Sequence, residues 1–155
     1  MKKIIALIAA LVMVLSLSAC FGGNNAQSTA DEVKLGDIAD YDKDFKGLSK
    51  FISESVKGSS VQEIYYDILG ADNGTRVVLN GNAYVEIYDF SSAKNDTAKA
   101  ILEDVKDDGK FKPMADGIEM TAVLTDSGKY VIAWDASRGY NYEKDIVTDE
   151  VKANW

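Results

Sequence analysis

Histidine is absent from this sequence of 155 residues, and cysteine and proline occur once each. The absence of histidine excludes the commonest general base and the commonest zinc ligand, and with them a Ser-His-Asp triad. A single cysteine excludes an internal disulfide framework and any metal site built from several cysteines. Basic residues are also few, 17 against 25 acidic ones. Because phosphate binding requires a clustered basic face, nucleic acid is not an expected partner.

Motifs that carry catalysis or bind cofactors are also missing. The sequence has no G-x-S-x-G motif and no glycine-rich phosphate loop. Asp40, Asp42 and Asp44 alternate like the first ligands of an EF-hand, but Phe45 and Phe51 stand where that loop requires glycine and glutamate. Carboxylates that complement the N-terminus of a helix explain the run better. We therefore expect no enzymatic activity, no cofactor and no metal ion.

The first residues have the pattern of an export signal. Lys2 and Lys3 precede an uninterrupted apolar stretch from Ile4 to Leu15, which small residues follow. A positive start, an apolar core and small residues before a cleavage point are the parts of a secretory signal peptide. The stretch is shorter than the roughly 20 apolar residues that a membrane span needs. We expect a signal peptide over residues 1–19.

Leu17-Ser18-Ala19-Cys20 resembles the lipobox of bacterial lipoproteins. The resemblance implies lipid transfer to the Cys20 sulfur and cleavage after Ala19. A thiolate is a suitable nucleophile for this transfer, and two or three acyl chains anchor stably where one chain binds only marginally. We expect a protein anchored by lipid to the extracytoplasmic face of the cell membrane. The whole pattern also resembles small uncharacterised lipoproteins of low-GC Gram-positive bacteria, which implies no activity and no functional residues.

The mature chain divides into a tether and one domain. Residues 20–40 hold the lipidated cysteine and a stretch rich in Gly, Asn, Gln, Ser, Thr and Ala, a composition typical of a flexible tether. Residues 41–155 are long enough for a single globular domain with one core. Removal of Lys2 and Lys3 leaves 15 basic and 25 acidic residues, so the mature net charge of −10 keeps the domain off anionic lipid headgroups.

Hydrophobic periodicity and turn residues predict the elements of this domain. They are a helix over 42–57, a strand over 63–69, a hairpin over 76–88 with an Asn80-Gly81 turn, a helix from Ser91 or Ser92 to Gly109, strands over 111–114, 118–124 and 129–135, and a last helix capped by Asn141. The order α-β-β-β-α-β-β-β-α predicts an α+β fold, an antiparallel sheet of about six strands with helices on one face. Residues 84–106 align with 130–152, which suggests an internal repeat or the shared pattern of any two strand-turn-helix units.

Four aromatic residues are the candidate binding residues. Strand alternation places Tyr84 and Tyr88 on one face of their strand, and Tyr130 and Trp134 on one face of theirs. If the helices cover the aliphatic faces, these four side chains form one exposed aromatic surface, suited to a protein or a sugar. The alternative is that they belong to the core.

Two functions are consistent with these features. The first is a non-catalytic binding or interaction module whose partner is an unknown protein or a cell-wall glycan. The alternative is a lipoprotein that captures a carbohydrate or another solute and serves a membrane machine. A single small domain lacks the two-lobed cleft usual for solute binding, which favours the first.

Overall fold

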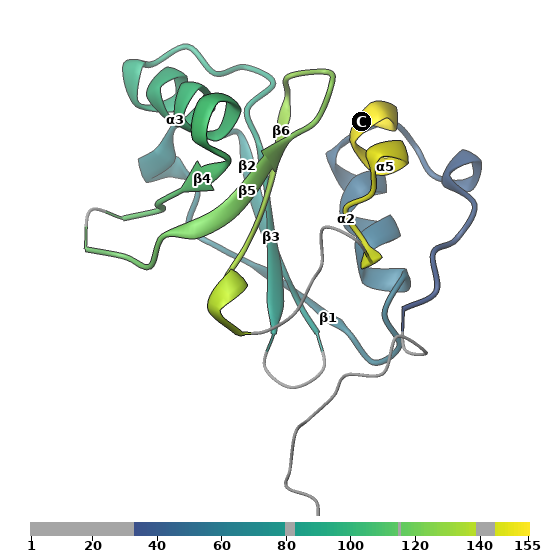
Figure 1. Ribbon diagram of the computed structural model, residues 1–155. Coiled ribbons are helices and arrows are strands. Elements are labelled where there is room, and N and C mark those ends of the chain that lie inside the picture. The colour runs from purple at the N-terminus through teal and green to yellow at the C-terminus, as the bar shows by residue number, and fades with distance from the viewer. Residues whose placement is uncertain (1–32, 80–82, 115, 139–144) are drawn as a thin grey trace, which may run out of the picture.

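The computed structural model describes residues 33–79, 83–114, 116–138 and 145–155 (Figure 1). In chain order its helices and strands are α2 (Phe45–Glu54), β1 (Ser60–Glu63), β2 (Asn73–Val78), β3 (Tyr84–Asp89), α3 (Asp96–Asp108), β4 (Lys110–Phe111), β5 (Met120–Leu124), β6 (Tyr130–Trp134) and α5 (Asp149–Asn154). Short 3-10 helices occupy Ile38–Asp40, Asp67–Leu69 and Ala136–Arg138.

The six strands form one antiparallel sheet in the order β1-β2-β3-β6-β5-β4. Strands β1, β2 and β3 form one meander, and β4, β5 and β6 form the other. The two meanders meet where β3 pairs with β6, with Val85 opposite Trp134 and Ile87 opposite Ile132. The α+β class and the antiparallel sheet of six strands are thereby confirmed.

Helices cover both faces of this sheet, so the prediction of helices on one face is wrong. Figure 1 shows α2 and α5 on one side of the strands and α3 on the other. The cause lies in the two central strands, because β6 is buried along its whole length and β3 is buried at every position except Tyr84. A strand with apolar side chains on both faces is stable only when both faces are covered.

The face under α2 and α5 holds the larger apolar core. Leu48, Phe51 and Ile52 of α2 are completely buried against it. Distant parts of the chain also meet here: the Trp155 ring lies 5.4 Å from the Phe51 ring, and the indole N–H of Trp155 donates to the carbonyl oxygen of Asp42 at 3.1 Å. This layer therefore joins the beginning and the end of the described chain.

The α3 face is covered over only part of its width. Helix α3 buries Ala98 and Val105 and contacts β4 and β5. At the opposite side of the same face, all four residues of β1 are exposed, and Arg76 and Val78 of β2 are half-buried. We call this partly exposed region of the described chain, over β1, β2 and the start of β3, the open half of the α3 face.

Residues 63–69 do not form the single strand that the sequence predicts. Strand β1 ends at Glu63, and the 3-10 helix Asp67–Leu69 follows. Between them the chain crosses β2 closely, since a Cβ atom on Gly74 would lie 2.8 Å from Cβ of Tyr66 and 3.1 Å from Cγ1 of Ile64. The glycine in β2 makes room for this crossing.

Side-chain caps explain where the helices begin. Helix α3 is capped by Asn95, whose Oδ1 accepts from the amide of Ala98 at 2.7 Å, and not by Ser91 or Ser92. Helix α2 is capped by Asp44, which accepts from the amide of Gly47 at 2.8 Å. Each cap satisfies an amide that has no partner within its helix.

The two ends of the domain also differ from expectation. Packing begins before residue 41, because Val33 forms a β-bridge with Val56 and the amide of Lys34 donates to the carbonyl of Ser55 at 2.8 Å. Helix α5 is capped by Thr148. The predicted cap Asn141 lies outside the described residues, as do the Asn80-Gly81 turn and residues 1–32.

The predicted repeat aligns residues that lie 46 positions apart in the sequence, and it matches the end of β3 with the end of β6. These two strand ends share one hydrogen-bond pattern. Oδ1 of Asp89 accepts from the amide and the hydroxyl of Ser91, at 2.9 and 2.5 Å. Oδ1 of Asp135 accepts from the same groups of Ser137, at 3.0 and 2.6 Å. The likeness is local, because aligned residues of β3 and β6 lie on opposite faces of the sheet. The internal repeat remains a prediction.

Candidate functional site

The four predicted aromatic residues do not share one exposed face, so that interpretation is wrong. Tyr130 and Trp134 lie in the core under α2 and α5, where 5% and 3% of their surfaces are exposed. Tyr84 and Tyr88 lie on the α3 face, and only 2% of Tyr88 is exposed. Tyr84 alone keeps part of its surface accessible.

The error comes from the register between strands. Alternation within each strand is as predicted, but Trp134 lies opposite Val85 and Tyr130 lies opposite Asp89. Residues that lie opposite each other in an antiparallel pair share a face. The aromatic set of β6 therefore lies on the aliphatic face of β3, and a shift of one residue would have reversed this.

Tyr84 lies in the open half of the α3 face, between the only two arginines of the chain. The guanidinium carbon of Arg76, from β2, lies 4.3 Å from the centre of the Tyr84 ring. The guanidinium carbon of Arg138, from the 3-10 helix after β6, lies 5.4 Å from the same centre. The other 15 basic residues of the chain are lysines. Both contacts are within the range of cation–π attraction. We call these three residues the Arg-Tyr-Arg cluster.

The buried carboxylate of Glu86 holds the guanidinium group of Arg76. Nε of Arg76 donates to Oε1 of Glu86 at 2.9 Å, and Nη2 pairs with the same oxygen. The hydroxyl of Tyr88 donates to Oε2 of Glu86 at 2.7 Å, so both carboxylate oxygens have partners. Burial of Tyr88, followed by the negative charge of Glu86, raises the pKa of its hydroxyl well above the ordinary range. Tyr88 is thus a neutral donor that fixes Glu86.

A second carboxylate holds Arg138. Nε of Arg138 donates to Oδ2 of Asp135 at 3.0 Å, while Ser137 donates to the other oxygen. The hydrogen bond from the Ser137 hydroxyl, followed by that from Arg138, lowers the pKa of Asp135 below its usual value. Asp135 therefore stays ionised at neutral pH and fixes the guanidinium above the sheet.

The cluster combines fixed cations with one aromatic ring at the surface. The Arg76 and Arg138 side chains are 36% and 41% exposed, whereas those of Glu86 and Asp135 are 3% and 6% exposed. The charged groups that reach solvent are thus the positive ones. Such an arrangement can bind an anion, or stack against a planar or sugar ring, without reorganisation of its own side chains.

The sequence interpretation missed Arg76, Glu86, Asp135 and Arg138 as site residues. One available signal was the scarcity of arginine, 2 among 17 basic residues. The pairing of Arg76 with Glu86 was hidden, because a turn of only Asn80-Gly81 would place Arg76 opposite Val85. In the structure the amide of Leu79 donates to the carbonyl of Ala83, so three residues connect the strands and Arg76 lies opposite Glu86.

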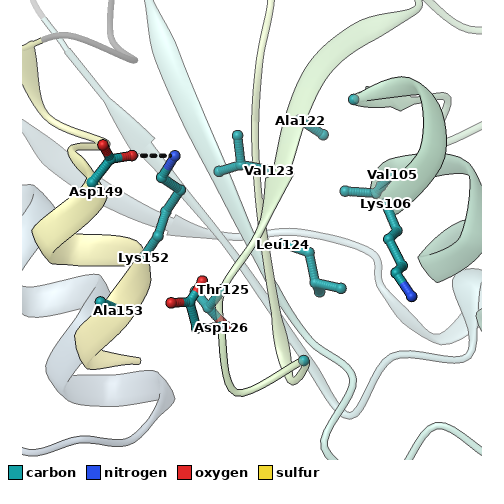
Figure 2. Close-up of a pocket in the computed structure, with 12 residues that line it drawn as sticks. Val105, Lys106, Ala122, Val123, Leu124, Thr125, Asp126, Asp149, Lys152 and Ala153 are labelled. Carbon is teal, nitrogen blue, oxygen red and sulfur yellow. Dashed lines mark ion pairs between the residues drawn. The ribbon is translucent and has the colours of Figure 1, made fainter.

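A separate hollow of about 770 Å³ opens at the edge of β5, between α3 and α5 (Figure 2). It arises because β4 pairs with β5 only at Thr121 and Met120. Its floor is the end of β5, and its walls carry Lys106 of α3 and the Asp149–Lys152 ion pair of α5, whose atoms lie 2.7 Å apart. Opposite charges alternate around this hollow, in contrast to the Arg-Tyr-Arg cluster.

Within the described residues, no three acidic, cysteine or histidine side chains gather closely enough to hold a metal ion. Nor does any helix in these segments have the length and apolar character needed to cross a membrane. Comparison of the chain with protein-family models, curated proteins and solved structures gave no match.

Proposed function

We propose that this protein is an extracytoplasmic lipoprotein, anchored to the cell membrane through Cys20, and that its domain is a non-catalytic binding module. The anchor rests on Leu17-Ser18-Ala19-Cys20 and on the signal-like residues before it. The short apolar stretch and the single cysteine support this reading of the sequence.

The binding surface in this proposal is the open half of the α3 face. The Arg-Tyr-Arg cluster is the observation that carries it, because arginine and tyrosine are the side chains most enriched where proteins bind partners. Gln62 lies opposite Arg76, and Val78 lies opposite Tyr84, so amide and apolar groups flank the cluster. The proposed partner is an envelope protein or a cell-wall glycan.

Capture of a carbohydrate or another solute for a membrane machine is the second candidate. The hollow at the β5 edge favours it, because its volume of about 770 Å³ falls within the range of small-ligand sites. Its lining carries both an aliphatic residue, Leu124, and the charged side chains of Lys106 and Asp126.

The anchor is tested by growth of producing cells with an alkyne-tagged fatty acid. The native chain is expected to take up the tag and to sediment with membranes. Cys20→Ser should remove the tag and release the chain from the membrane fraction, whereas Ser18→Ala, a small residue for a small residue, serves as the control. Equal labelling of the native chain and Cys20→Ser would refute the anchor.

The binding surface is tested with a photo-crosslinking amino acid placed at residue 84 in cells. We expect crosslinks to an envelope protein or retention on purified cell walls. The same amino acid at Tyr65, a tyrosine that is 92% exposed and outside the cluster, is the matched control. Equal capture from both positions would contradict a specific surface at Tyr84.

A further inference from the structure

Strand β1 forms one edge of the sheet, and within the described residues its outer side pairs with no other strand. It neighbours only β2 in the sheet order, and all four of its residues are exposed. The amide of Ile64, the next residue, donates to the carbonyl oxygen of Gly74 in β2 at 3.4 Å. Hydrogen-bonded pairs alternate along an antiparallel ladder, so Gln62 also exchanges bonds with β2, whereas Val61 and Glu63 direct their N–H and C=O groups outward.

This edge lacks the features that usually keep edge strands apart. Natural edges are protected by lysine, by proline or by a bulge. The β1 sequence Ser-Val-Gln-Glu contains neither residue type, and its register with β2 runs over all four residues without a bulge. Apolar side chains are exposed on the strand and directly after it: Val61 at 53%, Tyr65 at 92% and Ile68 at 65%. The edge is therefore suited to the addition of another strand.

Charge favours a copy of the same chain as the added strand. With a net charge of −8, two copies repel each other over most of their surfaces. The first three residues of β1 are uncharged, and Glu63 is its only charged residue. The other edge strand, β4, has two residues, which are too few for such a join. Identical surfaces that meet across a two-fold axis are also the commonest arrangement in protein dimers.

We propose that β1 pairs antiparallel with β1 of a second copy, so that two sheets become one across a two-fold axis. The inference goes beyond the proposed function and does not depend on the anchor. In the inferred register, Val61 lies opposite Glu63 of the second copy, and the two Gln62 residues lie opposite each other on the axis. Every outward N–H group of both strands then finds an outward C=O group of the other copy.

The two neighbouring symmetric registers are poorer. A shift that places Val61 on the axis would pair Glu63 with Ser59. The amide of Ser59 already donates to the carbonyl oxygen of Val56 at 3.2 Å. A shift in the other direction would place the two Glu63 carboxylates directly opposite, where like charges destabilise the pair. The register with Gln62 on the axis avoids both costs.

The pairing also extends the open half of the α3 face. Gln62 lies opposite Arg76, whose own partner across the sheet is Glu86. Residues opposite each other in an antiparallel pair share a face, so the axis stands perpendicular to the sheet and both open halves lie on the same side. A partner that contacts both copies gains from two attachments.

Disulfide crosslinking in cells that produce the full chain tests the register. Cβ atoms of opposite residues lie about 4.5–5.5 Å apart, within reach of a disulfide, so Gln62→Cys should form a covalent dimer under a mild oxidant. Ser60→Cys is the matched control on the same face, because the inferred register separates the two copies of residue 60 by roughly 14 Å. It should crosslink at least tenfold less, and the native chain, whose only cysteine is Cys20, gives the background. Equal crosslinking of both variants, or none above background, would overturn the inference.

A proline variant separates pairing of the backbones from contact of the side chains. Val61→Pro, combined with Gln62→Cys, removes an outward N–H group and leaves the bonds to β2 intact, as proline is tolerated at such edge positions. The crosslinked fraction should fall about tenfold, whereas Val61→Thr, which keeps the N–H group, should preserve it. Unfolding midpoints show whether each variant retains the fold. Undiminished crosslinking of a folded Val61→Pro variant would contradict the pairing of the two strands.

Discussion

The two faces of the sheet are built from different chemistry. The face under α2 and α5 buries a continuous apolar set that includes Val85, Ile87 and Ile132, each completely buried. The α3 face places a carboxylate, Glu86, in the middle of a central strand at 2% exposure. A buried ion pair contributes little to stability compared with apolar residues of the same size. The contrast indicates that the α3 face, which has a smaller apolar core of its own, also maintains the position of charged groups.

Truncation of one large aromatic residue on each face is expected to give the largest difference in the free energy of unfolding. Trp134→Ala should lower the free energy of unfolding by about 3–5 kcal/mol, because it leaves a cavity in the apolar core. Tyr84→Ala should cost about 1–2 kcal/mol, since it removes the contacts with two arginines and the packing of a partly exposed ring at the margin of the α3-face core. Urea unfolding measures both, and equal losses would remove the distinction between the faces.

Replacement of Glu86 should have a smaller effect that reverses when its partners are also replaced. Glu86→Leu is expected to cost about 1–3 kcal/mol, because the Tyr88 hydroxyl loses its acceptor and Arg76 loses its ion pair. The triple variant with Arg76→Met and Tyr88→Phe should recover most of this loss. A triple variant less stable than Glu86→Leu alone in urea unfolding would show that the buried charge stabilises the fold.

The smallest expected effect is a pH dependence at Asp135. The folded-state pKa of this carboxyl is lowered from its ordinary value of 3.8, so its ionised form stabilises the fold above that value. This stabilisation is lost as the pH falls below about 4 and through the lowered pKa. The stability difference between the native chain and Asp135→Asn should thus be largest near neutrality and shrink in acid. Asp116→Asn, at an exposed loop residue, is the matched control variant.

Local features of the sequence predicted most of the elements, with the strand over 63–69 as an exception, whereas the long-range arrangement of the strands did not follow from them. Asp44 and Gly109 mark helix ends in the structure as their residue types indicate, and the strands of the predicted hairpin pair as β2 and β3. The register of β3 against β6 depends on packing of the whole sheet, and no residue in either strand encodes it alone. For that reason the face of Trp134 was mispredicted.

The site was harder to predict than the fold, because its residues come from three separate segments. Arg76 lies in β2, Tyr84 in β3 and Arg138 beyond β6, and only the sheet order brings them together. In contrast, the presence of helices on both faces of the sheet could have been predicted from the sequence. The strand Tyr130–Trp134 contains no charged side chain, and its only polar side-chain groups are the tyrosine hydroxyl and the indole N–H, as expected of a strand buried on both faces.

The hydrogen bond from Trp155 to Asp42 spans 113 residues and has a consequence for folding order. Helix α2 is synthesised early. The ring of its residue Phe51, however, packs against the ring of Trp155, which is synthesised last among the described residues. Until residue 155 is available, the apolar side of α2 lacks part of its cover. Contacts of such sequence separation slow folding and prolong the exposure of apolar surface. The apolar side of α2 is therefore fully covered only after residue 155 has joined the core.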